Sequence, residues 1–294
     1  MSNFWGKRKA RLAGAVSLIC AGPLIWVLAA GFAFAGGAGS AFAQSELAPA
    51  GREVIETRLT QFATENGQRR ARLRAIFQEA GCEGQSLADQ PVHRSRVPNL
   101  VCTLPGTTGS VIVVGAHFDF VGAGKGVADN WSGAALLPTL FENLRGQTRR
   151  HTFVFVAFSD EEKGLKGSRS YVRRLTPEQK AGTRAMVNLD SLGLSRSKVW
   201  FSRADPKLAD ALYRVAGSMN VALETFNLDR LGSSDSEPFR KGKIPSITIH
   251  SLTKETRGIL HSYRDDLQVI RLDDYYETYR LVPAYLALLD TALE

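Results

Sequence analysis

The sequence predicts a three-layer α/β fold, in which a mixed, mostly parallel β-sheet is flanked by α-helices. Short continuous apolar runs at residues 111–114 and 153–158 are typical of strands buried on both faces. Longer segments with helical spacing of apolar residues alternate with such runs along the chain. Strands that alternate with helices form mainly parallel sheets covered on both faces, so these observations together favour this fold class.

The expected elements follow one another in a clear order. Residues 54–62 and 72–77 carry Val, Ile, Leu and Phe at helical spacing among charged residues, and we expect helices there. Residues 97–103 form a first expected strand, which Pro105 and Gly106 end. The other expected elements are strands at 111–114, 153–158, 185–189, 199–201 and 244–249, and helices at 132–144, 167–175, 206–219 and 272–293.

The composition is that of a globular protein with one generous core. The 294 residues are 44% hydrophobic and 22% charged, which excludes a disordered, collagen-like or coiled-coil chain. No repeat or low-complexity stretch interrupts residues 51–294. We therefore expect a single domain over residues 44–294.

The distribution of charge argues against a nucleic-acid-binding protein. The formal net charge is +8, but Lys7, Arg8, Lys9 and Arg11 lie together at the N-terminus. Without them the net charge falls to +4, spread over a chain in which both signs are mixed. We therefore expect no nucleic-acid partner.

The N-terminal segment, residues 1–43, is expected to be a signal peptide or a membrane anchor. Residues 12–45 contain no charged side chain, and the basic cluster precedes them. Ala41-Phe42-Ala43 has the small-x-small form of a signal-peptidase site, whereas the apolar run is also long enough to span a bilayer. Both interpretations place the body in the periplasm or outside the cell, with membrane attachment only if the segment is not cleaved.

Export makes the cysteines informative. Three cysteines are too few for a disulfide-rich scaffold or a four-cysteine zinc site. Cys82 and Cys102 lie in the exported part, where an oxidising compartment favours a disulfide between them. The alternative is a pair of buried thiols.

Acidic residues and histidines follow the predicted buried strands. In parallel sheets the chemistry lies beyond the carboxyl ends of the strands, so these residues are expected at one sheet edge. They are His117 and Asp119 after the run 111–114, Glu161 and Glu162 after 153–158, Asp190 after 185–189, Asp129 before a helix, and His261 after the last strand.

Each of these motifs has a simpler interpretation when it is taken alone. Asp129 could cap a helix, and Glu161 with Glu162 could be a solvated first helical turn. Together, however, they supply imidazole and carboxylate ligands for two divalent ions such as zinc, with a carboxylate between them. The predicted ligands are His117, Asp129, Glu162, Asp190 and His261. Glu161 is left over and could act as a general base.

At this point the chain resembles the zinc aminopeptidase family that also contains the glutaminyl cyclases. Order and spacing match from about residue 54 to 290. The glutamate pair with its following glycines is the most specific part of the match. The motifs are GAHFD at 115–119, ADNWSG at 128–133, EEKGLKGS at 161–168, NLD at 188–190 and LHS at 260–262.

The resemblance implies a zinc-exopeptidase-like fold and a role for each residue. It implies that His117 and Asp190 bind one zinc ion, that Glu162 and His261 bind the other, and that Asp129 bridges them. It further implies that Glu161 is the general base and that Asp119 orients the imidazole of His117. The family often has a histidine where this chain has Ser236, so the substrate pocket is expected to differ there. Asp235, Ser236 and His250 are the candidate pocket residues, and Asp265 is expected to shape the loop after His261.

We therefore expect an exported metalloaminopeptidase with two zinc ions, acting on peptide substrates through a hydroxide that bridges the metals. The first alternative is a glutaminyl-peptide cyclotransferase on the same scaffold, with one zinc ion. The second is a non-catalytic binding module, which the presence of all six metal and base positions disfavours. Cleavage at the other peptide terminus or deacylation of a small amide stays open, because the same metal chemistry serves them.

Overall fold

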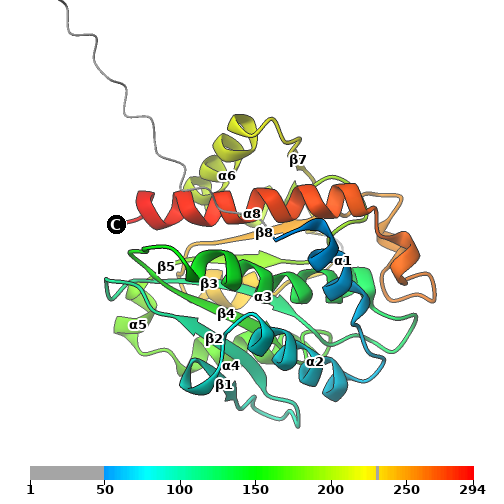
Figure 1. The fold of residues 1–294 in the computed structure, drawn as a ribbon, viewed down its shortest axis with the longest axis horizontal. Helices are drawn as coiled ribbons and strands as arrows, with labels where there is room; N and C mark the ends of the chain where they lie inside the picture. The colour runs from blue at the N-terminus through cyan, green and yellow to red at the C-terminus, as the bar shows by residue number, and fades with distance from the viewer. Residues whose placement is uncertain (1–49, 230–231) are drawn as a thin grey trace, which may run out of the picture. The chain divides into compact units, whose positions relative to one another are not determined.

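A mixed β-sheet forms the centre of the computed structural model, which describes residues 50–229 and 232–294 (Figure 1). Its strand order is β1-β2-β4-β3-β5-β8-β6-β7. The strands are β1 Leu87–Gln90, β2 Asn99–Leu104, β3 Val111–His117, β4 Thr152–Phe158, β5 Thr183–Leu189, β6 Lys198–Val199, β7 Glu224–Thr225 and β8 Ser246–His250. The predicted signal peptide or anchor lies outside the described residues. Among the helices described, none has the length and apolar character needed to cross a membrane.

The four central strands are parallel, as the apolar runs predict. β3 pairs in parallel with both β4 and β5, and β5 pairs in parallel with β8. Antiparallel pairs join β1 to β2, β2 to β4 and β6 to β8 at the two sides. The predicted mixed, mostly parallel sheet is therefore confirmed.

Helices cover both faces of this sheet, because alternate strand residues point to opposite sides. Ile112 and Val114 face the larger core, which contains residues from α1, α2, α3, α6 and α8. Val113 faces a smaller core with Tyr171 of α4 and Phe239 of α7. The helices are α1 Arg52–Thr60, α2 Asn66–Glu79, α3 Ser132–Arg145, α4 Lys166–Arg174, α5 Pro177–Gly182, α6 Pro206–Ser218, α7 Ser236–Lys241 and α8 Leu272–Ala292. In Figure 1, α8 runs along one side of the sheet and α4 lies on the other.

Several short elements differ from the predictions. The strand expected at 199–201 stops at Val199, and Phe201–Arg203 forms a 3-10 turn. The sequence did not indicate β1, β7, α5 or α7. Both residues of β7 are exposed and β1 buries only its first residue fully, so neither has an apolar pattern that marks a strand. The helix at 72–77 is longer than expected and spans Asn66–Glu79.

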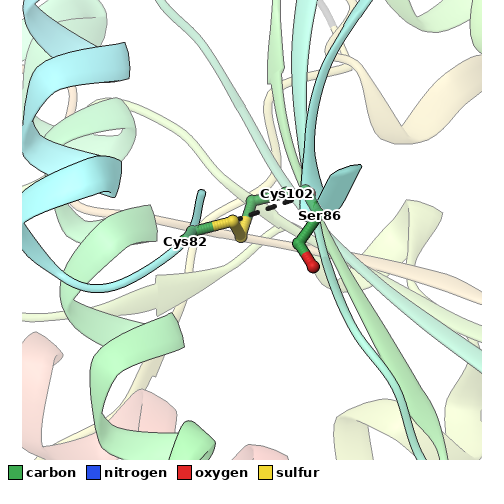
Figure 2. Close-up of a disulfide and its surroundings, with 3 residues drawn as sticks. All are labelled: Cys82, Ser86 and Cys102. Atoms are coloured by element: carbon green, nitrogen blue, oxygen red, sulfur yellow. Dashed lines mark hydrogen bonds between the residues drawn. A yellow bond between two sulfur atoms is a disulfide. The ribbon is translucent and has the colours of Figure 1, made fainter. Parts of the chain in front are cut away.

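The predicted disulfide between Cys82 and Cys102 is present and fully buried (Figure 2). Cys82 follows α2, and Cys102 lies on β2. The bond therefore fixes the end of α2, in the helical layer, to the antiparallel side of the sheet.

Replacing both cysteines by alanine is expected to lower the free energy of unfolding by about 3 kcal/mol, because the bond closes a short loop in the unfolded chain. Chemical denaturation of the variant and of the wild type, each with and without reductant, measures the effect. Reductant should destabilise the wild type and leave the variant unchanged. Equal stability of the two oxidised proteins would contradict the prediction.

Candidate metal centre

The carboxyl ends of three neighbouring parallel strands carry most of the predicted site residues. β3 ends at His117, with Asp119 two residues later. β4 ends at Phe158, shortly before Glu161 and Glu162, and Asp190 directly follows β5. Because β4, β3 and β5 lie side by side, these residues meet at one sheet edge.

Two groups of potential ligands share one carboxylate. In the first group, Nε2 of His117 lies 3.2 Å from Oδ1 of Asp129 and 3.8 Å from Oδ1 of Asp190. In the second, Nε2 of His261 lies 3.1 Å from Oδ2 of Asp129 and 3.0 Å from Oε2 of Glu162. Asp129 thus offers one oxygen to each group, which is the arrangement that a carboxylate bridging two ions requires.

The donor types fit divalent cations. Within each group the ligand atoms lie within 4.8 Å of one another, and each group combines one imidazole with two carboxylates. Zinc accepts these ligands in a tetrahedral arrangement and leaves a position open when the protein supplies three. Glu161 belongs to a further group with His117 and Glu162, so its carboxylate lies beside the two ligand groups.

Asp119 joins two segments of the site. Nδ1 of His117 lies 3.1 Å from the carbonyl oxygen of Asp119, which fixes the hydrogen on Nδ1 and leaves Nε2 facing the acids. The carboxylate of Asp119 accepts hydrogen bonds from the backbone N–H groups of Glu161 (3.0 Å) and Glu162 (3.3 Å). The backbone carbonyl of Asp119 thus contacts the histidine, its carboxylate lies 3.7 Å from Nδ1 of His117, and the carboxylate holds the turn that carries the glutamates.

Asn130 and Asp265 position the segment that carries Asp129. The side chain of Asn130 donates to the carbonyl of Leu189 (2.9 Å) and accepts from the backbone N–H of Ser191 (3.1 Å), on either side of Asp190. The carboxylate of Asp265 accepts from the backbone N–H of Asp129 at 3.1 Å. The ligand segments are thus held to one another through the backbone, and the carboxylate of Asp265 links the loop after His261 to the segment of Asp129.

Three turns at the site adopt a backbone conformation that favours glycine. Asp160, Ser191 and His261 have φ values of 52°, 56° and 56°. Residues with a side chain rarely adopt such conformations, which persist where the surrounding structure imposes them. Each residue is a ligand candidate or adjoins the glutamate pair or Asp190.

The crowded carboxylates shift one another's ionisation. Burial, followed by the negative charges of Asp235, Asp190 and Asp129, raises the pKa of Glu161 well above its usual range. Burial and the charge of Asp129 raise the pKa of Glu162 to about 7. Hydrogen bonding to Asp129 raises the pKa of His261 to about 9. A cluster of acids that destabilises its own charges in this way favours the binding of cations.

Arg69, on α2, holds the backbone of the segment that joins His117 to Asp129, and the sequence analysis did not identify it. Its guanidinium is fully buried and donates to the carbonyls of Phe118 (3.0 Å), Gly126 (2.8 Å) and Lys125. These carbonyls lie in the segment between His117 and Asp129. Burial lowers the pKa of Arg69 to about 10, so it stays charged at neutral pH. An arginine at this position of an amphipathic helix gives no signal that distinguishes it from a solvated one.

Replacing Arg69 by methionine is expected to lower the free energy of unfolding by at least about 3 kcal/mol, because several buried carbonyl groups lose their partner. Denaturant unfolding in chelator measures this on the metal-free protein. Arg72→Met changes an exposed arginine of the same helix and should be nearly neutral. Similar stability of the two variants would show that Arg69 does not support the site.

The predicted pocket residues lie in two places. Asp235 is buried near Glu161, and burial raises its pKa to about 7. Ser236 bonds to Thr248 at 2.8 Å. His250 donates from Nε2 to the carbonyl of Phe226 (2.9 Å) and accepts at Nδ1 from the N–H of Leu252 (3.1 Å), and burial lowers its pKa to about 4. Both ring nitrogens of His250 are thus engaged by the backbone, and the proposed contacts of these three residues with a substrate stay predictions.

Curated relatives match parts of this chain. The leupeptin-inactivating enzyme 1 of Streptomyces exfoliatus is 32% identical over 151 residues, which are 50% of this chain and 34% of the relative. Aminopeptidase YwaD of Bacillus subtilis is 29% identical over 182 residues, 59% of this chain and 40% of the relative. The chain therefore spans well under half the length of these two relatives.

Solved structures share the fold over most of the described domain. The LapA aminopeptidase of Legionella pneumophila has a TM-score of 0.70 at 21% identity, over 84% of this chain and 74% of that chain. BSAP, a zinc aminopeptidase from Bacillus subtilis, has a TM-score of 0.60 at 23% identity, over 67% and 50%. A glutaminyl cyclase from an Acidobacteriales bacterium has a TM-score of 0.64 at 16% identity, over 82% and 93%. The family itself is shown by the sequence: residues 99–286 match Peptidase family M28, and the chain belongs to that family.

Proposed function

We propose that this protein is an exported metalloaminopeptidase that uses two zinc ions to remove N-terminal residues from peptides. The observation that carries the proposal is Asp129, whose two oxygens face two separate ligand groups. His117 and Asp190 would hold one ion, and Glu162 and His261 the other. The names of the M28 relatives, which include aminopeptidases, support the same activity.

The zinc ions would supply Lewis-acid polarisation of the scissile carbonyl and of water. Glu161 would take a proton from the attacking water and return it to the leaving amine. Burial, followed by the charges of neighbouring carboxylates, raises the pKa of Glu161 well above its usual range, so its carboxylate binds a proton more readily than an exposed glutamate does. Asp119 would hold His117 and the glutamate turn in place throughout, because it contacts both.

A second function is favoured by one observation. The glutaminyl cyclase is matched over 93% of its length, whereas the LapA aminopeptidase is matched over 74% of its own. A glutaminyl-peptide cyclotransferase therefore remains the alternative, and one zinc ion per chain would be expected for it.

A panel of aminoacyl anilides and an N-terminal glutaminyl peptide, assayed with and without chelator, tests the proposal. We expect the enzyme to hydrolyse the anilides and to bind two zinc ions per chain. Chelator should abolish the hydrolysis, and added zinc should restore it. Cyclisation of the glutaminyl peptide without hydrolysis would support the alternative. Zinc binding without turnover of any substrate would indicate a binding module.

We further propose that the domain works in the periplasm or outside the cell. The disulfide between Cys82 and Cys102 supports this location, because such bonds persist in oxidising compartments. Fractionation of the native host, with determination of the N-terminus of the recovered protein, distinguishes a cleaved signal peptide from a retained anchor. Recovery of the protein in the cytoplasm would contradict the proposal.

A further inference from the structure

We propose that a basic pocket beside the metal centre binds acidic side chains in the downstream part of the peptide substrate. The proposal rests on the proposed peptidase function and adds a substrate class to it. The basic pocket is an open surface pocket of about 390 Å³ between the loop after β1 and α4. It is lined by Pro91, Val92, His93, Ser170, Arg173 and Arg174.

Hydrogen bonds hold the walls of the basic pocket together. The backbone N–H of His93 donates to Oγ of Ser170 at 3.1 Å, which fixes the loop to α4. Arg174 donates to the carbonyl of Pro91 at 3.0 Å. One guanidinium of the lining is therefore held against the loop by a hydrogen bond to its backbone.

The lining of the basic pocket has two guanidinium groups and an imidazole but no acidic side chain. Arg94, Arg96 and Arg169 are also exposed on the same loop and helix. Over the part of the chain that the structure describes, none of these six basic side chains forms an ion pair with a carboxylate. Elsewhere on the surface, arginines such as Arg203 and Arg214 do have acidic partners. An arginine guanidinium can bind a carboxylate with two parallel hydrogen bonds, so unpaired arginines favour an acidic ligand.

The loop that forms one wall of the basic pocket contacts the turn that carries the glutamate pair. The loop 91–98 joins the end of β1 to the start of β2, and β2 starts beside the end of β4. Oγ of Ser159 donates to the carbonyl of Val97 at 2.7 Å, and Nζ of Lys166, at the start of α4, donates to the carbonyl of Arg94 at 3.4 Å. The loop therefore contacts the turn that carries Glu161 and Glu162.

The separation suits a peptide that extends from the metal centre. Arg173 lies seven residues after the start of α4, which at about 1.5 Å per residue is roughly 10 Å along the helix. An extended chain covers about 3.3 Å per residue, so this length of α4 corresponds to about three residues of extended peptide, and only a side chain at least three residues after the cleaved bond would reach the pocket. An acidic side chain of the peptide at that distance would meet an arginine of the basic pocket.

A peptide fits this surface better than an anionic membrane does. Ala50, the first described residue, bonds through its N–H to the hydroxyl of Tyr279 on α8. α8 packs on the larger core, whereas α4 packs on the smaller core across the sheet. Ala50 packs against the larger core, so the basic pocket lies on the opposite face of the sheet from Ala50.

The test compares two octapeptides, Leu-Gly-Ser-Gly-Asp-Glu-Asp-Gly and its counterpart with Asn and Gln in place of the acids. For the wild-type enzyme at low salt, KM for the acidic peptide is expected to be at least fivefold lower, with similar kcat. The preference should disappear in the Arg173→Glu/Arg174→Glu variant and at about 0.5 M salt. The matched control, Lys207→Glu/Arg214→Glu on α6, should keep it.

The outcomes separate the two proposals. Leucine anilide is too short to reach the basic pocket, so all variants should hydrolyse it equally. No hydrolysis of any substrate would overturn the proposed function, whereas hydrolysis with equal KM for both octapeptides would overturn this inference alone. If the wild type shows no peptide preference but binds phosphatidylglycerol vesicles, and charge reversal abolishes that binding, the pocket binds the membrane and this inference is overturned. Raised KM for the acidic peptide in inorganic phosphate, without effect on the neutral one, would support a carboxylate-binding pocket.

Discussion

Replacement of Glu161 by glutamine is expected to lower kcat by about 10²- to 10⁴-fold while zinc stays bound. Glutamine keeps the shape of the side chain but cannot accept a proton from water. The five proposed ligands are unchanged, and the backbone N–H of residue 161 still donates to Asp119. The metal groups formed by Asp129 with its two partners on either side should therefore remain.

The measurement combines kcat for leucine anilide with the zinc content of the same sample. Glu178→Gln, at an exposed position in the first turn of α5, is the matched control and should change neither quantity. Loss of zinc in Glu161→Gln would make Glu161 a ligand, which its place beside His117 and Glu162 also allows. Unchanged kcat would remove it from the reaction.

The central sheet could be predicted because its strands are buried on both faces. Continuous apolar runs such as 111–114 are typical of strands buried on both faces, and their alternation with helices predicted the parallel pairing that the structure shows. The outer strands could not be predicted in the same way. β7 is two exposed residues long, and only its pairing with β6 makes it a strand.

The proximity of His117, the glutamate pair and Asp190 could be predicted because these residues follow buried strands, whereas the residues that support them could not be predicted. His117 and Asp190 come directly at strand ends, where the parallel sheet brings them together. Arg69 and Asn130 bond to backbone carbonyls far away in sequence. Every residue has a backbone carbonyl, so the sequence does not indicate which ones these side chains bind. The strand-end rule also selected His250, whose ring nitrogens instead bond to the backbone.

Replacement of Asp129 by asparagine is expected to have the second large effect, which is the loss of paired zinc binding. The carboxylate of Asp129 offers Oδ1 to the group of His117 and Oδ2 to the group of His261, 3.2 and 3.1 Å from their Nε2 atoms. An amide has one oxygen and no negative charge, so it can serve at most one of the groups. We expect one zinc ion or fewer per chain and a fall in kcat of at least about a hundredfold.

The His261→Ala variant is compared with Asp129→Asn to separate the loss of one ligand from the loss of the shared carboxylate. It removes a ligand from one group only, so the ion held by His117, Asp129 and Asp190 should stay, and the zinc content should fall from two to one. Calorimetric titration of the metal-free proteins measures stoichiometry and affinity without relying on activity. Asp273→Asn, at an exposed position in the first turn of α8, is the control and should bind two ions. If Asp129→Asn also binds two ions with wild-type affinity, each group is complete without the shared carboxylate. The two ions would then be independent, and a mechanism that needs both of them around one carboxylate would fail.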